Sequence, residues 1–301
     1  MPPAGSSVQP TRDVGSVAAL RPGQPIDGVY ACARKDRLLS RVGTPYLALD
    51  LRDRTGTIAA RVFRDADVLA GRFERGDLVH VRGRVERFRD ALQIEVATIA
   101  AAPAGEADPG DFLPVAYRDL DELEGFLEHL VGEVYDPGLR ALLAGLLGDE
   151  RLRAQLRRAP CSRAGHHAYL GGLLEHTVAV ATLALECAQL HPRLDRDLLL
   201  TAALVHDIGK TGEFTYGAEI GLSEEGRLLG HVELGLRLLE QVAPPALSSE
   251  YRLSLAHCVL AHHGSDALPG RRFGSAEALA LYRLNALDAT VKGALEHGLP
   301  A

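Results

Sequence analysis

The stretch LVHDIGKTGEF, residues 204–214, places a histidine beside an aspartate after an apolar run and then breaks at a glycine and a lysine. The preceding residues, LLLTAAL, predict a packed helix. Because an unpaired buried charge is expensive, we expect a cation beside Asp207. The stretch therefore predicts a helical domain with a buried site for positive charge.

Further histidines and aspartates occur in the apolar helices predicted on either side of this stretch. A single histidine on an apolar face is as readily a satisfied core residue as a ligand, but seven candidates together favour a metal site. Adjacent pairs lie about 100° apart on a helix and could therefore serve two ions. The candidate metal ligands are His176, His206, Asp207, His231, His262, His263 and Asp288.

The first part of the chain has a different periodicity. Residues 26–102 alternate apolar and polar positions between turn signals, which predicts five strands. A short helix is predicted at residues 66–76, between the third and fourth strands, as in a five-stranded Greek-key barrel of the OB type. The predicted fold class is therefore multidomain, with an all-β OB-type barrel followed by an all-α helical domain.

Composition and periodicity divide the chain further. A Pro-, Gly- and Ser-rich tail, predicted to be disordered, is followed by the barrel, a linker with a helical connector, and the domain with the candidate ligands. These segments are expected at residues 1–15, 16–104, 105–158 and 159–301. Helices are predicted at 121–132, 138–158, 167–190, 195–209, 229–241, 248–263 and 275–297.

The formal charge of −7 hides an asymmetry between the two parts of the chain. Residues 1–104 carry 16 Lys and Arg against 12 Asp and Glu, and the remainder carries 17 against 28. The basic part allows a nucleic-acid partner, and the acidic, histidine-rich part is compatible with divalent cations. Solvated acidic helix faces would produce the same charge sum.

Cysteines and hydropathy indicate the compartment. Cys32, Cys161, Cys187 and Cys258 lack the C-x-x-C spacing of a thiolate zinc site, so we interpret them as reduced core thiols. No apolar run approaches the roughly 18 residues of a membrane span, and the N-terminus lacks the pattern of a signal peptide. We expect a cytoplasmic protein without a membrane partner.

The ordered set H, HD, H, HH and D on helices resembles the metal-dependent phosphohydrolase superfamily named for its His-Asp pair, the HD superfamily. The resemblance implies an HD phosphohydrolase domain at 159–301 with two divalent ions that share Asp207. It assigns His176, His206, Asp207 and Asp288 to one ion, and His231, His262 and His263 to the other.

A narrower resemblance rests on HHAYLGGLLEHT at residues 166–177 together with LRDRTGTIAARVF at residues 51–63. These segments, over about residues 16–295, resemble the YhaM-type 3′→5′ exoribonucleases. The family implies an OB-fold nucleic-acid-binding module, manganese as the metal, and single-stranded RNA as the partner, with single-stranded DNA left open. Families built in this way often form homo-oligomers. Iron would also suit a histidine-rich site with carboxylates.

The predicted reaction is hydrolysis of a phosphodiester by hydroxide generated at two metal ions. Only three of the 33 basic residues are lysines, and two of them, Lys210 and Lys292, lie by the proposed site. A compact ammonium can reach a phosphate oxygen as a point charge, unlike a planar guanidinium. The predicted catalytic residues are His206, Asp207 and Lys210.

Substrate contacts are predicted in both domains. Near the metal ligands they are Lys210, Lys292, His166, His167 and Tyr169. In the barrel, aromatic and basic residues that alternate on strands form a typical platform for single strands. The barrel candidates are Tyr30, Tyr46, Phe63, Phe73 and Phe88 with Arg54, Arg61 and their basic neighbours, and Tyr46, Phe63, Arg54 and Arg61 are preferred. Phe73 and Phe88 could equally belong to the barrel core, and many of the arginines could simply be solvated.

Two alternative functions remain open. The chain could be an HD hydrolase of small cyclic or alarmone nucleotides in which the barrel is a regulatory module. It could also be a nucleic-acid-binding protein with a vestigial hydrolase, although the complete set of ligands argues against this. Deletion of residues 1–104 would separate the first alternative from an exonuclease, because a small-nucleotide enzyme gains little from a basic groove.

Overall fold

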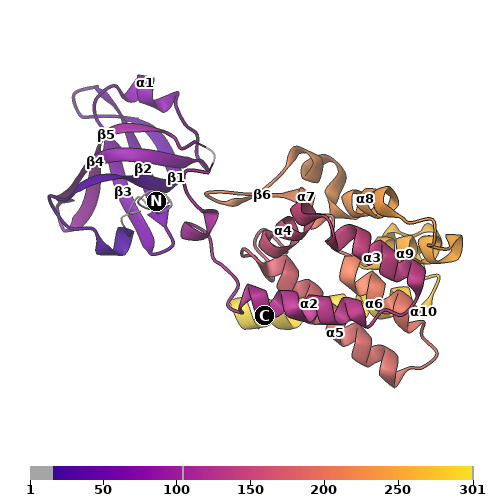
Figure 1. Cartoon of the computed structure of the whole chain (residues 1–301). Helices are drawn as coiled ribbons and strands as arrows, with labels where there is room; N and C mark the ends of the chain where they lie inside the picture. The colour runs from indigo at the N-terminus through magenta and orange to yellow at the C-terminus, as the bar shows by residue number, and fades with distance from the viewer. Residues whose placement is uncertain (1–15, 104, 300–301) are drawn as a thin grey trace, which may run out of the picture. The chain divides into compact units, whose positions relative to one another are not determined.

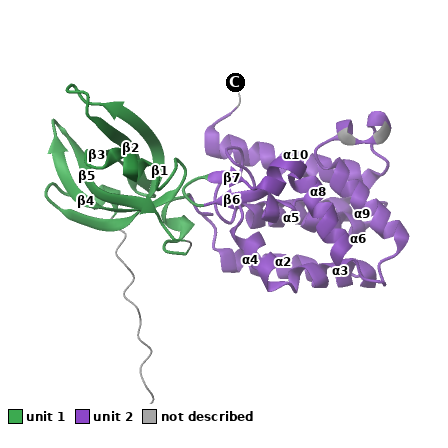
Figure 2. Cartoon of the chain, turned by 90° about the horizontal axis from the view of Figure 1, so that it is seen from above, with its two compact units in different colours: residues 1–113, 217–219 green, residues 114–216, 220–301 purple. Residues whose placement is uncertain are grey.

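The computed structural model describes residues 16–103 and 105–299, and the chain forms two compact units. Unit 1 extends to Leu113 and includes Gly217–Glu219, whereas unit 2 comprises Pro114–Tyr216 and the chain from Ile220 onward (Figure 2). The tail predicted for residues 1–15 lies outside the described residues.

Unit 1 is built around a closed five-stranded barrel with the strand order β1-β2-β3-β5-β4 (Figure 1). Neighbouring strands are antiparallel except β3 and β5, which run parallel and close the barrel. The helix α1 (Ala66–Ala70) lies between β3 and β4, where the sequence predicts it. The strands are β1 (Pro25–Leu39), β2 (Pro45–Asp53), β3 (Gly56–Val62), β4 (Leu78–Phe88) and β5 (Ala91–Ala101). The OB-type barrel of the predicted fold class is confirmed.

Alternate residues of the strands fill the barrel, as Leu47, Leu49 and Leu51 of β2 illustrate. Two aromatic rings predicted to stack on nucleic acid belong to the same core: Tyr30 is 1% exposed and Phe73 is 3% exposed. The stacking prediction is wrong for Tyr30, and for Phe73 the alternative of a core residue is confirmed. Burial of one large apolar side chain contributes roughly 1.5–3 kcal/mol, so these rings stabilise the barrel and are inaccessible to a ligand.

Unit 2 is helical, which confirms the second part of the predicted fold class. Its leucine-rich core runs from α2 to α10, and 11 of the 19 residues of α5 are buried. The helices are α2 (Leu120–Gly132), α3 (Pro137–Leu147), α4 (Glu150–Arg158), α5 (Gly172–Leu190), α6 (Arg196–Val205), α7 (Lys210–Glu213), α8 (Glu224–Val242), α9 (Ser249–Ala261) and α10 (Ala276–His297). A two-stranded hairpin of β6 (Phe214–Tyr216) and β7 (Ile220–Leu222), which the sequence does not predict, follows α7.

Local backbone features explain where the helices differ from those predicted. The helix predicted at 138–158 is divided because Asp149 caps α4 and accepts hydrogen bonds from two backbone N–H groups of its first turn. The helix predicted at 167–190 begins only at Gly172, since His167 (φ 51°) and Gly171 (φ 81°) adopt left-handed conformations. The helix predicted at 195–209 ends at Val205.

One described helix, α5, is long and apolar enough by length and composition to cross a membrane, although the sequence predicts no such run. The helix packs against α6, α10 and α2 within unit 2 and carries His176 among its buried residues. These contacts make α5 a core helix of the helical domain.

Candidate metal centre

The predicted metal ligands come from five segments of unit 2: α5, the turn after α6, α8, the end of α9, and α10 (Figure 1). The residues from Leu198 to Val205 in α6 are all buried, which fixes this helix in the core. The helix ends at Val205, so His206 and Asp207 follow directly in the turn that leads to α7. The local sequence thus places two polar side chains at the buried end of an apolar helix.

Asp207 lies at the centre of the cluster and is 2% exposed. Its Oδ2 is 3.5 Å from Nε2 of His176 and 3.4 Å from Nε2 of His206. Its Oδ1 is 3.5 Å from Nε2 of His231 and 3.4 Å from Nε2 of His262. Each carboxylate oxygen therefore faces two imidazoles, and the residue joins two groups of candidate ligands.

Hydrogen bonds to the backbone fix the tautomers of two of these imidazoles. Nδ1 of His206 lies 2.9 Å from the carbonyl oxygen of Ala203, and Nδ1 of His262 lies 2.6 Å from that of Val259. A carbonyl oxygen only accepts, so Nδ1 carries the proton in both rings and Nε2 presents a lone pair. Both lone pairs face oxygens of Asp207.

The Nε2 lone pairs of His206 and His262 face the lone pairs of the Asp207 oxygens, with no proton between them. A metal cation placed between them would bind all of these lone pairs. Among the described residues, Asp207 Oδ1 and His262 Nε2 are buried without a hydrogen-bond partner. The ligand atoms of His176, His206 and Asp207 lie within 4.8 Å of one another, as do those of Asp207, His231, His262 and His263. The residues present therefore fit a bound metal ion.

The protonation states also suit a metal. Burial lowers the pKa of His176 and of His262, so both imidazoles are neutral near pH 7, as a metal ligand must be. Burial alone would raise the pKa of Asp207, but the charge of the nearby Lys210 ammonium lowers it well below its ordinary value. The centre thus combines neutral imidazoles with a charged carboxylate.

Asp288 lies with a different set of histidines from the one predicted. Its Oδ2 is 2.6 Å from Nδ1 of His176 and 3.0 Å from Nε2 of His167. The ligand atoms of these three residues form a group that shares His176 with the group of His176, His206 and Asp207. In this structure Asp288 therefore orients His176 toward the centre.

Lys210 is the first residue of α7 and is buried beside Asp207. Its Nζ donates to Asp207 Oδ2 at 2.7 Å and to Cys161 Sγ at 3.5 Å. Burial alone would lower the pKa of Lys210, but the charge of Asp207 and the presence of Cys161 raise it above its ordinary value. The ammonium remains charged and balances part of the carboxylate charge.

The other predicted substrate residues near the centre already have partners. Nδ1 of His167 is 2.8 Å from the hydroxyl of Tyr169, which donates to Glu175, and Lys292 Nζ donates to Glu175 at 2.9 Å. His166 is half-buried, and burial lowers its pKa to about 4. Lys292 and Tyr169 thus belong to a polar network beside the centre.

Three residues of this region are absent from the prediction. Cys161, which the sequence predicts only as a core thiol, accepts a hydrogen bond from Lys210. Glu175, directly before His176 in the chain, accepts hydrogen bonds from Tyr169 and Lys292. Glu213 Oε1 lies 3.1 Å from His231 Nδ1. Glu213 belongs to the quoted stretch LVHDIGKTGEF, where a carboxylate six residues after Asp207 was the available signal.

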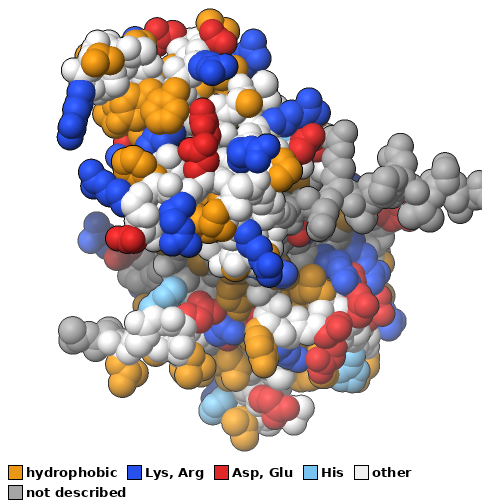
Figure 3. All heavy atoms as spheres, turned by 90° about the vertical axis from the view of Figure 1, so that its left-hand side faces the viewer, with side chains coloured by type: hydrophobic (Ala, Val, Ile, Leu, Met, Phe, Trp, Pro, Cys, Tyr) orange, Lys and Arg blue, Asp and Glu red, His pale blue; other side chains and the backbone are white. Residues whose placement is uncertain are grey.

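The barrel presents a second set of candidates. Phe63 is 48% exposed, and its ring centroid lies 5.7 Å from that of Tyr46. Arg54 is exposed, whereas Arg61 is half-buried and donates to the carbonyl of Ala60. Figure 3 shows hydrophobic and basic side chains close together on one face, with acidic side chains among them.

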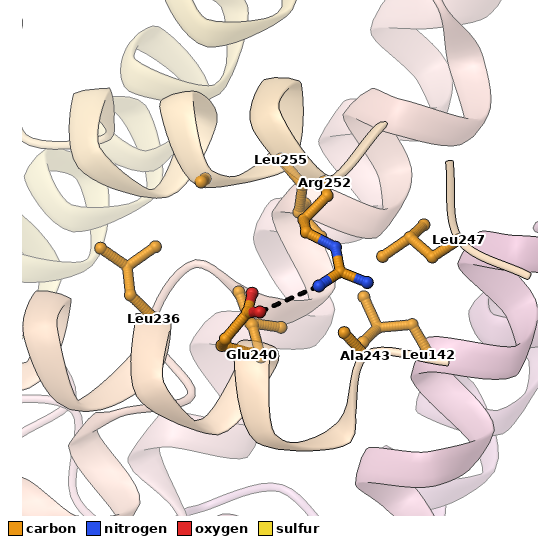
Figure 4. A pocket seen from close by; sticks show the side chains of 9 residues that line it. Leu142, Leu236, Glu240, Ala243, Leu247, Arg252 and Leu255 are labelled. Atoms are coloured by element: carbon orange, nitrogen blue, oxygen red, sulfur yellow. Dashed lines mark hydrogen bonds and ion pairs between the residues drawn. The ribbon is translucent and has the colours of Figure 1, made fainter. Parts of the chain in front are cut away.

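Cavities also lie outside the metal cluster, and two of them show what lines such sites. One, of about 710 Å³ on the barrel, is lined by Phe63 and by arginines such as Arg64, Arg82 and Arg84, together with four carboxylates. The other, of about 280 Å³ in unit 2, has leucines around the Glu240–Arg252 ion pair (Figure 4). No candidate metal ligand lines either cavity, so both are distinct from the metal centre.

Comparison with known proteins agrees with this division. Residues 173–290 match the model of the HD domain, and residues 32–100 match that of an OB-fold nucleic acid binding domain. The HD match contains every predicted metal ligand.

Curated relatives match this chain over most of its length. The chain is 28% identical over 250 residues to the 3′-5′ exoribonuclease YhaM of Shouchella clausii, covering 81% of this chain and 76% of the relative. The YhaM of Bacillus subtilis is 28% identical over 244 residues, with 80% and 77% covered. That of Halalkalibacterium halodurans is 27% identical over 274 residues, with 89% and 84% covered.

Proposed function

We propose that this chain, which joins an OB-fold nucleic acid binding domain to an HD domain and is homologous to the YhaM exoribonucleases, is a metal-dependent 3′→5′ exoribonuclease. The observation that carries the proposal is the buried carboxylate of Asp207, with two imidazoles facing each of its oxygens. A single shared carboxylate between two ligand groups suits a site for phosphodiester hydrolysis.

In this proposal His176, His206 and Asp207 hold one divalent ion, and Asp288 completes that side of the centre. The second ion is held by His231, His262 and His263, with Asp207 shared. Manganese is the proposed metal. When bound, such ions supply the activation of water and the stabilisation of negative charge that hydrolysis of a phosphodiester requires.

Lys210 is proposed to act on the substrate phosphate as well as on Asp207. An ammonium has three N–H donors, and two of them are directed at Asp207 and Cys161. The third can meet a phosphate oxygen beside the shared carboxylate. His166, half-buried near His176, and Lys292 are proposed to border the path of the substrate.

The barrel is proposed to hold single-stranded RNA. Its exposed ring of Phe63, next to Tyr46, can stack on a base, and Arg54, Arg61 and Arg64 can contact phosphates. Stacking accepts any base because every base has a π face, so this surface suits an enzyme that must process a strand regardless of sequence.

Incubation of the manganese-loaded protein with three substrates tests the function: 5′-labelled single-stranded RNA, the matching DNA, and a cyclic dinucleotide. We expect nucleoside monophosphates and a 5′-labelled ladder that shortens from the 3′ end of the RNA. An Asp207→Asn variant is the control for contaminating nucleases. Hydrolysis of the cyclic dinucleotide with the RNA left intact would instead identify a small-nucleotide hydrolase.

A further inference from the structure

We infer that Glu213 is a positioning residue that fixes the tautomer and the orientation of His231 in the metal centre. The inference rests on the proposed metal-dependent function and adds a residue to it. Glu213 is 9% exposed and ends the short helix α7, three residues after Lys210.

Two hydrogen bonds connect the residues. Oε1 of Glu213 accepts from the backbone N–H of His231 at 3.1 Å and from Nδ1 of the same residue at 3.1 Å. A carboxylate only accepts, so Nδ1 carries the proton and Nε2 presents its lone pair. That Nε2 lies 3.5 Å from Asp207 Oδ1 and 2.9 Å from Nε2 of His263.

The backbone is shaped for this contact. Gly230, directly before His231, has φ 72° and ψ 164° and interrupts the helical geometry of α8. This conformation is open to glycine at little cost and leaves the His231 N–H free to bond the carboxylate. A Cβ on Gly226 would lie 2.2 Å from the carbonyl oxygen of Glu213, so the two segments are in direct backbone contact.

A second close approach lies at the other end of α7. A Cβ on Gly209 would lie 2.0 Å from the carbonyl oxygen of His231. Glycines on both sides therefore allow α7 to pack against the backbone of α8. This packing holds Glu213 and His231 together independently of any metal.

The other imidazoles that face Asp207 are fixed by different groups. His206 and His262 bond backbone carbonyls three residues earlier in their own helices, and His176 bonds Asp288. Loss of the Glu213 carboxylate should therefore release His231 alone. The expected result is a selective weakening of one ion, since substitution of such outer partners typically lowers metal affinity by about 10–100-fold.

Calorimetric titration of the metal-free protein with Mn²⁺ tests this for the wild type, Glu213→Ala, Glu213→Gln and Glu225→Ala. Glu225 is an exposed carboxylate in the first turn of α8 and serves as the matched control. We expect two ions in the wild type and in Glu225→Ala, and a second ion bound about 10–100-fold more weakly in Glu213→Ala. Glu213→Gln keeps an acceptor oxygen and should restore most of the affinity.

Binding of both ions to Glu213→Ala with wild-type affinity would overturn the inference. If Glu213→Ala does not fold, nitrogen-15 NMR of His231 in the metal-free wild type decides. A proton on Nδ1 supports the role of Glu213, and a proton on Nε2 contradicts it.

The inference and the proposed function can fail separately. A wild type that binds no Mn²⁺ would overturn both. RNA left intact by a protein that binds two ions, with the second weakened in Glu213→Ala, would reject the exonuclease and support the positioning role.

Discussion

The candidate site residues of the helical domain are mostly buried and hydrogen-bonded, whereas two main candidates of the barrel are exposed. Around Asp207 the candidate ligands are mostly buried, and each imidazole that faces the carboxylate is fixed through its other nitrogen. On the barrel, Phe63 and Arg54 are exposed, and the ring of Phe63 lies beside that of Tyr46. Under the proposed function, chemistry would depend on side chains fixed by the fold, whereas binding of a strand would use side chains that can adapt to the ligand.

Substitution of Asp207 should give the largest difference between the effect on turnover and the effect on RNA binding. Asp207→Asn removes the charge that both ions would share, so turnover should fall by about a thousandfold or more, in keeping with the several kcal/mol that metal ions contribute. Metal analysis should find both ions lost, while RNA binding should change little. Asp266→Asn, at an exposed carboxylate, is the control. Retention of both ions in Asp207→Asn would contradict the shared-ligand model.

Lys210 in the helical domain and Lys35 in the barrel allow a matched pair of substitutions. Lys210→Ala should lower turnover by roughly 100-fold, the effect typical of a lost charge-stabilising donor. Lys210→Arg should also lower it, because a planar fork cannot take the place of Nζ between Asp207 and Cys161.

The control is Lys35→Arg in the barrel, where Nζ bonds the carbonyls of Ala70 and Phe73. Steady-state kinetics should show no change in turnover for that variant. Full activity of Lys210→Arg would indicate that Lys210 only pairs with Asp207 and does not contact the substrate.

The barrel should respond in binding rather than in turnover. Phe63→Ala should cost about 1–3 kcal/mol of affinity for single-stranded RNA if the ring stacks on a base. Affinity should also fall steeply with salt as phosphate contacts release counterions. Fluorescence anisotropy measures both effects, and Tyr117→Ala, at a fully exposed ring outside the barrel, is the control. Unchanged affinity in Phe63→Ala would remove the ring from the binding surface.

The smallest effect concerns acid stability of the metal-free protein. Burial holds the pKa of His176 and His262 below that of an unfolded chain, so the unfolded state binds more protons as pH falls below about 6.5. Stability should therefore decrease from pH 7 toward pH 5. Thermal melts of the wild type and His262→Gln measure the slope, which should be shallower in the variant. A wild-type melting temperature that rises on acidification would contradict the sign.

The sequence predicts the five strands of the barrel and most helices of unit 2 because periodicity reports which residues are buried, but it misses the β6–β7 hairpin and the break at Asp149. It predicts the candidate ligands for the same reason, since a polar residue in an apolar helix requires a partner. It does not reveal that Asp288 bonds His167, because this contact joins α10 to a loop 121 residues earlier in the chain. In the barrel, alternation separates the two faces of a strand but does not show that Tyr30 of β1 faces inward, and Phe73 lies outside the strands, between α1 and β4.

The close approach of Gly209 to the carbonyl oxygen of His231 also restricts insertions and deletions in the segment from Asp207 to Glu213. Asp207, Lys210 and Glu213 follow one another at intervals of three residues in a turn and a four-residue helix. One inserted residue would rotate Glu213 by about 100° away from His231, and one deletion would do the same in reverse. Chains that share this centre should keep the interval from Asp207 to Glu213 fixed and accept insertions between α9 and α10, where residues 264–275 carry no candidate ligand.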